Sequence, residues 1–160
     1  MGIAASELRE YVIRPTLLYL GRHSSTAEVL LLSIAACQSS FGEALHGQED
    51  SYGLYRISGD AHKRLWDEHL ALDPNLASQV RGLASQHAFL AAPHVELTVN
   101  LRYATAIAWM LIEAHSMELP DSADIHRLAR IWRRVFQPKG HLSDFIQAWP
   151  RCLPDCHHAA

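Results

Sequence analysis

The chain has 160 residues, of which 49% are hydrophobic and 19% charged, and this composition predicts a packed globular domain rather than a disordered chain. A net charge of −3 excludes a general attraction to nucleic acid or to an anionic membrane, so such a partner would need a local basic patch. Three cysteines cannot all pair, so no disulfide framework is expected. Because neither a signal peptide nor a membrane-spanning run is visible, we expect synthesis in the cytoplasm without membrane insertion.

The first third of the chain predicts a broken helix followed by a buried one. Pro15 indicates that a helix over residues 6–20 ends or kinks at the preceding arginine. Ser25, with Glu28 three residues on, has the form of a capping box and predicts a helix over residues 26–39. That segment is apolar nearly all round, which is typical of a helix buried on most sides.

The remainder predicts a polar loop over residues 40–57, with an extended segment at its end, and then further helices. We expect Ser58 or Asp60 to cap a helix through residues 66–70, and Asp73 to cap a helix over residues 74–90. A further helix is expected over residues 94–115. Asp121 or Ser122 should cap the next helix, and Ser143 should cap a short last one. The sequence therefore predicts one all-α domain of about seven helices around a buried central helix. It comprises residues 1–150, with 151–160 as a C-terminal tail.

The stretch from Ile34 to Ser58 organises the chain. A helix ends in Ala-Ala-Cys-Gln-Ser-Ser-Phe-Gly at 35–42, and Gly-Leu-Tyr-Arg-Ile-Ser follows at 53–58. This pattern resembles the phage-type branch of the soluble lytic transglycosylase and goose-type lysozyme superfamily, in which a helix end carries Glu-Ser and a Gly-Leu/Ile-x-Gln-Ile/Met segment follows. Further segments match in order and rough spacing, namely 13–21, 66–67, 81–86, 100–108 and 132–140.

The resemblance implies a helical lobe with a groove for an alternating amino-sugar polymer, and it places Gln38 where the family has its catalytic glutamate. The family glutamate protonates the glycosidic oxygen, which an amide cannot do because it has no titratable proton. Arg56 stands where the family has a later glutamine. The implied groove residues are Ser39, Gly53, Tyr55, Arg56, Asn100 and Tyr103.

A relocated acid is the alternative, and Glu43, five residues beyond Gln38, is the candidate. The simpler interpretation is that Glu43, Glu49 and Asp50 are solvated loop charges. Arg56 could then either pair with one of them or change the ligand preference of the site.

Three functions remain open. The first is a phage virion-associated structural or adaptor protein built on a degenerate, inactive domain. The second is an active peptidoglycan-cleaving transglycosylase or muramidase, and the third is a non-cleaving glycan-binding module. The expected partners are other virion proteins, including further copies of this chain, and peptidoglycan glycan strands, with no nucleic acid and no cofactor. The expected location is the host cytoplasm during assembly and the phage particle afterwards.

Two other clusters have ligand-like composition. Cys152, Cys156, His157 and His158 are residue types that bind zinc, but they lie in the terminal tail, and we expect no metal there. His126, Arg127, Arg130, Arg133 and Arg134 form a basic stripe that could contact phosphate or an acidic partner. A solvated helix face opposite an apolar one explains the stripe without any ligand.

Overall fold

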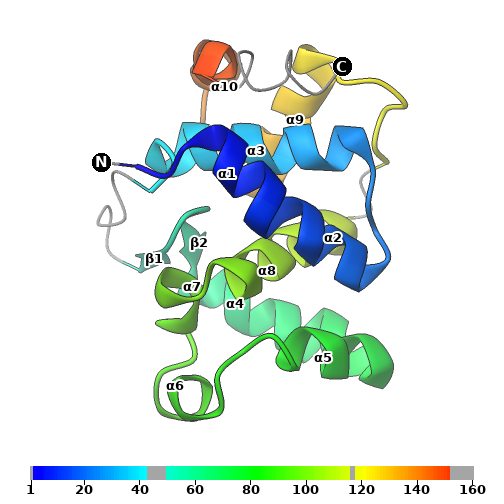
Figure 1. The fold of residues 1–160 in the computed structure, drawn as a ribbon, viewed down its shortest axis with the longest axis vertical. Helices are drawn as coiled ribbons and strands as arrows, with labels where there is room; N and C mark the ends of the chain where they lie inside the picture. The colour runs from blue at the N-terminus through cyan, green and yellow to red at the C-terminus, as the bar shows by residue number, and fades with distance from the viewer. Residues whose placement is uncertain (1, 43–49, 116–117, 152–160) are drawn as a thin grey trace.

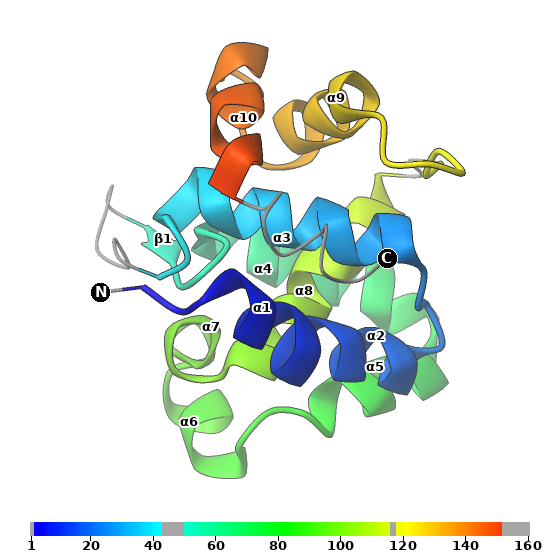
Figure 2. The same cartoon turned by 45° about the horizontal axis from the view of Figure 1, so that its top comes forward.

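Helix α3, Ser25–Ser39, runs through the middle of the molecule. The computed structural model describes residues 2–42, 50–115 and 118–151. The N-terminal helices and α8, Leu101–Ala114, lie on one side of α3, and α9, Ile125–Val135, and α10, Leu142–Ala148, lie on the other (Figures 1 and 2). The chain is 69% helical and 3% strand, which confirms the predicted all-α domain with a buried central helix.

The cap of α3 differs from the prediction. The Oγ of Ser24 accepts the hydrogen bond from the backbone N–H of Ala27 at 3.0 Å, so the helix begins one residue earlier than the predicted capping box. Glu28 points instead into an ion cluster, where its carboxylate accepts hydrogen bonds from the Nε of Arg9 and of Arg14, each at 3.0 Å. The capping-box prediction was wrong because tertiary ion pairing outweighs a local cap at this position.

The interruption predicted near Pro15 takes the form of a π-helical segment rather than an end of the helix. α1, Ala5–Leu8, a π-helical segment, Arg9–Ile13, and α2, Arg14–Leu20, follow one another without leaving helical backbone angles. Pro15 lies in the first turn of α2, directly after the π-helical segment. The wider π turn accommodates a ring that would collide with the preceding carbonyl in a regular α-helix.

A small hairpin begins shortly after residues 43–49. β1, Ser51–Tyr52, pairs antiparallel with β2, Ile57–Ser58, and residues 53–56 form the turn, which corrects the predicted continuous extended segment. The backbone N–H of Arg56 donates to the carbonyl of Gly53 at 3.1 Å. Gly53 has φ +78°, and a Cβ there would lie 2.0 Å from the Leu97 carbonyl oxygen on α7, Glu96–Val99. The turn can therefore approach α7 only because residue 53 is glycine.

Two predicted caps are confirmed and two predicted long helices are divided. Ser58 caps α4, Gly59–Arg64, and Asp73 caps α5, Pro74–Arg81. The predicted 74–90 helix ends at Arg81 and resumes as α6, Gln86–Ala91. The predicted 94–115 helix is interrupted at Asn100, whose backbone is extended and whose Oδ1 caps α8. π-helical Leu65–His69 and 3₁₀ Leu70–Leu72 continue α4, and 3₁₀ Trp149–Arg151 follows α10.

The last two predicted caps were wrong. Asp124, rather than Asp121 or Ser122, accepts hydrogen bonds from the first backbone amides of α9. Ser143 lies inside α10, which follows His141 without a side-chain cap. Among the described residues, none of the helices has both the length and the apolar character needed to cross a membrane.

Candidate functional site

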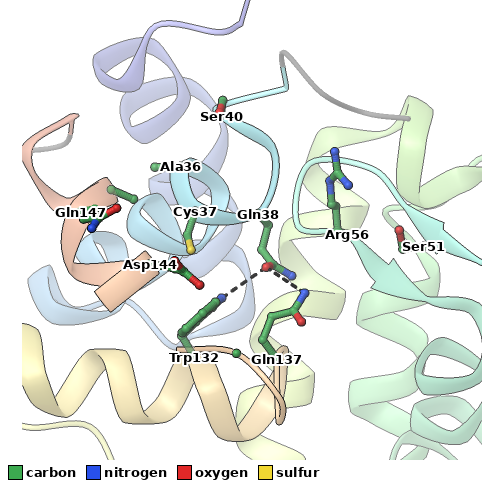
Figure 3. Close-up of a pocket in the computed structure, with 12 residues that line it drawn as sticks. Ala36, Cys37, Gln38, Ser40, Ser51, Arg56, Trp132, Gln137, Asp144 and Gln147 are labelled. Carbon is green, nitrogen blue, oxygen red and sulfur yellow. Dashed lines mark hydrogen bonds between the residues drawn. The ribbon is translucent and has the colours of Figure 1, made fainter. Parts of the chain in front are cut away.

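The amide of Gln38 lies on the last turn of α3 and is held by three hydrogen bonds. Its Oε1 accepts from the indole Nε1 of Trp132 and from the Nε2 of Gln137, each at 3.3 Å, as the dashed lines in Figure 3 show. Its Nε2 donates to the backbone carbonyl of Tyr55 at 3.1 Å. An indole N–H can only donate and a carbonyl can only accept, so these two partners fix which end of the amide carries oxygen.

Gln38 borders a cavity of about 490 Å³ between the end of α3, the hairpin, the end of α9 and α10. Its walls are mainly polar, and they are formed by Ala36, Cys37, Gln38, Ser40, Ser51, Arg56, Trp132, Gln137, Gly140, Asp144, Gln147 and Ala148. A second hollow of about 260 Å³ shares Ser51, Arg56 and Gln137 with the first. The two hollows therefore adjoin beside the hairpin.

Among the described residues that line it, the cavity has many neutral hydrogen-bonding groups and one side chain of each charge. Arg56 and Asp144 lie on opposite sides of the Gln38 amide (Figure 3). Arg56 comes from the hairpin turn and has φ +47°, a left-handed conformation that is unusual for a residue with a side chain. Amide groups and hydroxyls are suited to a ligand that is neutral and rich in hydroxyl and amide groups.

Three of the residues implied by the resemblance lie beside the cavity as supports. The Oγ of Ser39 is buried and donates to the Leu54 carbonyl at 2.6 Å, which ties the helix end to the hairpin turn. The hydroxyl of Tyr55 lies 2.8 Å from the Oγ1 of Thr105 on α8, and burial raises the pKa of this phenol well above its usual range. Together with Gly53, these residues position the backbone carbonyl of Tyr55, to which the Gln38 amide donates a hydrogen bond.

Asn100 and Tyr103 lie outside the cavity. Asn100 caps α8, and its Nδ2 donates to the Leu83 carbonyl at 2.8 Å. The fully buried Tyr103 hydroxyl lies 2.7 Å from the Nε2 of His62 and accepts from the indole Nε1 of Trp66 at 3.0 Å. Burial raises the pKa of Tyr103 above its usual range. These two residues thus stabilise the contacts of α8 with α4 and with the loop before α6 rather than contact a ligand in this cavity.

Sequence reasoning missed Asp144, Gln137 and Gln147, which reach the cavity from α10 and from the loop that follows α9. No sequence motif marks them, because only the packing of α9 and α10 against α3 brings them beside Gln38. The proposed substitute acid Glu43, and Glu49 with it, lie outside the described residues. Asp50 lines the second hollow.

Two buried polar clusters away from the cavity contain titratable groups. The Nδ1 of His62 lies 2.9 Å from the Nδ1 of His94, and burial, together with the nearby charge of His94, lowers the pKa of His62 to about 4. Burial alone would raise the pKa of Glu28, but hydrogen bonds from Arg14, Arg9 and His23 outweigh it and hold that pKa below its usual range. Neither cluster resembles a metal site, and the described part of the chain contains no group of three or more metal-ligating side chains.

Compared with protein-family models, curated proteins and solved structures, the chain matches none of them. The interpretation of the site therefore rests on its residues and geometry.

Proposed function

We propose that this chain is a non-cleaving, lysozyme-like domain that serves as a structural or adaptor protein of a bacteriophage particle. We further propose that its cavity binds the amino-sugar strands of peptidoglycan without hydrolysing them. The observation that carries this proposal is the buried amide of Gln38, held in one orientation at the edge of a polar cavity.

The loss of cleavage follows from the chemistry of Gln38. A general acid must hold a proton near neutral pH and release it to the leaving oxygen, which a carboxyl group in an apolar environment can do. The Gln38 amide has no such proton, and its oxygen already accepts two hydrogen bonds. Asp144 also lines the cavity, but it is exposed rather than enclosed by apolar side chains.

The retention of binding follows from the size and lining of the cavity. A volume of about 490 Å³ falls within the roughly 300–1,000 Å³ range of small-ligand sites. The lining glutamines and serines supply both donors and acceptors, which the acetamido and hydroxyl groups of an amino sugar require. The adjoining second hollow gives room for a further sugar of the same strand.

Calorimetric titration with a tetramer of N-acetylglucosamine, followed by mass spectrometry of the same mixture, tests both parts. We expect saturable binding and an unchanged tetramer. Gln147→Trp should fill the cavity and abolish binding, whereas Gln79→Trp, an exposed glutamine on α5, should leave binding unchanged. Shortened sugars in the wild-type mixture, or no saturable binding, would contradict the proposal.

The presence of Asp144 in the cavity favours a second candidate, a glycosidase that uses a different carboxylate. In that case Asp144→Asn would abolish release of soluble fragments from peptidoglycan. Glu43→Gln tests the loop carboxylate in the same assay. If wild-type protein releases no fragments, neither variant has an activity to lose and this candidate fails.

A further inference from the structure

Helix α9 carries all of its basic side chains on one face. His126, Arg127, Arg130, Arg133 and Arg134 are all exposed. At about 100° per residue, these five positions occupy an arc of about 120° on the helix surface. The buried residues of the helix occupy the opposite side and are Leu128, Ala129, Ile131 and Trp132. The helix itself lies beside α10 (Figure 2). We call the five exposed positions the basic face.

Among the described residues, no acidic side chain forms an ion pair with the arginines of the basic face. No acidic residue occurs between Ile125 and Val135. Neighbouring like charges at three- and four-residue spacing destabilise a helix. Four of the 14 Lys and Arg residues of an otherwise acidic chain are thus concentrated on one helix of 11 residues.

We propose that the basic face binds the phosphate backbone of a nucleic acid, without sequence preference. Adjacent arginines on a helix have Cβ atoms about 5–6 Å apart, and their planar guanidinium groups can each contact a phosphate through two hydrogen bonds. Contacts between arginines and phosphates need only an exposed, positively charged surface, and they do not depend on the base sequence. The net charge of −3 predicts no nucleic acid partner, but a net charge does not reflect the local concentration of arginine on α9.

The absence of apolar groups on this face distinguishes nucleic acid from other anionic partners. A protein interface depends on a few buried aromatic or aliphatic anchors, and a helix bound to a membrane surface inserts apolar side chains. The large exposed hydrophobic residues of the described chain, such as Leu72, Leu90 and Val99, lie on other helices or in loops rather than on α9. A face of charge alone is suited to a polyelectrolyte backbone.

The basic face and the Gln38 cavity are on different sides of α9. Trp132 points from the buried side toward Gln38 (Figure 3), whereas the arginines are exposed on the other side of the helix. A nucleic acid on the basic face would therefore leave the cavity open. The inference does not depend on what the cavity binds.

Fluorescence anisotropy with a labelled duplex of about 20 base pairs, measured between 25 and 200 mM NaCl, tests the proposal. Three to four phosphate contacts predict that the logarithm of the binding constant falls with the logarithm of salt concentration with a slope of about −3. Arg127→Gln/Arg130→Gln/Arg134→Gln should weaken binding at least tenfold and reduce the slope to between zero and about −1, because Arg133 is the arginine that remains on this face. A duplex of unrelated sequence should bind equally well.

The matched control removes the same charge from exposed positions elsewhere, as Lys63→Gln/Arg64→Gln/Arg102→Gln. This control should bind nearly as tightly as the wild type. Circular dichroism tests whether both triple variants are folded. We expect that they are, because glutamine is a good helix former. Equal losses in the two variants, or no salt-dependent binding by the wild type, would overturn the proposal. Tighter competition by polyglutamate than by unlabelled duplex would also overturn it and would indicate an acidic protein partner.

Discussion

The indole Nε1 of Trp132 donates a hydrogen bond of 3.3 Å to the Oε1 of Gln38, although 94 positions of sequence separate the two residues. Trp132 is almost fully buried between α9 and α3, and it also packs against Phe145 with ring centroids 5.7 Å apart. The contact joins the C-terminal pair of helices to the end of α3. It makes Gln38 a structural residue as well as a cavity residue.

Replacing Gln38 with methionine tests that structural role. The variant keeps the length of the side chain but leaves the Trp132 indole and the Tyr55 carbonyl without their partner. Unsatisfied buried polar groups cost about 1–3 kcal/mol, so the free energy of unfolding in urea should fall by that amount. Gln147→Met, on the exposed wall of the same cavity, should change it by less than about 0.5 kcal/mol. Equal effects of the two substitutions would show that the hydrogen bonds at Gln38 do not stabilise the fold.

Two glycines with similar backbone angles allow the contact between the hairpin and α7 to be measured. Gly21 has φ +71° with open space around its Cβ position, so Gly21→Ala should cost about 1 kcal/mol from the backbone alone. Gly53, with φ +78°, places the new methyl group 2.0 Å from the Leu97 carbonyl oxygen. We expect Gly53→Ala to lower the melting temperature several times as much as Gly21→Ala. Similar shifts would mean that the hairpin does not pack on α7 as described.

The ion cluster at Glu28 stabilises the contact between α3 and the N-terminal helix. The Glu28 side chain is 3% exposed and that of Arg9 is 10% exposed. Glu28→Gln leaves the Arg9 cation buried without its counter-charge, which should cost about 3–5 kcal/mol in chemical denaturation. Glu68→Gln removes a surface pair with Arg64 in which both side chains are 65% exposed, and it should cost less than about 0.5 kcal/mol. A small effect of Glu28→Gln would contradict a stabilising role for the cluster.

His62 makes the stability of the fold depend on pH. Because its pKa is about 4 in the fold and 6.5 in an unfolded chain, the unfolded state binds more protons between these values. Stability is therefore highest above pH 6.5 and falls as the pH drops toward 4. The free energy of unfolding should be about 2 kcal/mol lower at pH 5 than at pH 7.5.

The matched comparison for this pH dependence uses two glutamine substitutions. His62→Gln should be less stable at pH 7.5, but its stability should change much less between pH 7.5 and pH 5. His126→Gln, which alters an exposed histidine, should retain the wild-type slope. The carboxyl groups of Glu28 and Glu96, whose pKa values are lowered, lose their contribution only at more acidic pH. An unchanged slope in His62→Gln would assign the acid sensitivity to another group.

Local chemistry predicted the parts of the fold that depend on neighbouring residues. The apolar character of residues 26–39 identified the central helix, and Ser58 and Asp73 were recognised as caps because each has a suitable hydroxyl or carboxylate at a helix start. The break at Asn100 was missed because the apolar pattern continues on both sides of it. Its cause is tertiary, since the Asn100 side chain also bonds to the Leu83 carbonyl and to Glu96.

The sequence predicted only those residues of the candidate site that lie in the stretch from Ile34 to Ser58, which carries the family-like pattern. Gln38 and Arg56 were identified from that segment, and both line the cavity. Asp144, Gln137 and Gln147 were not identified, because their position depends on how α9 and α10 pack against α3. The positions of Asn100 and Tyr103 differ from the implied groove for the same reason: their hydrogen bonds to α4 and to the loop before α6 turn them away from the cavity.

Release of soluble fragments from purified peptidoglycan by the wild-type protein beside Gln38→Glu tests most directly whether the domain has lost its acid. Glutamate keeps an acceptor for Trp132 and Gln137 and changes only the group that faces the Tyr55 carbonyl. We expect no release by the wild type and measurable release by Gln38→Glu. Release by the wild type at the level of an active enzyme would contradict the loss of catalysis and would assign the acid to another carboxylate.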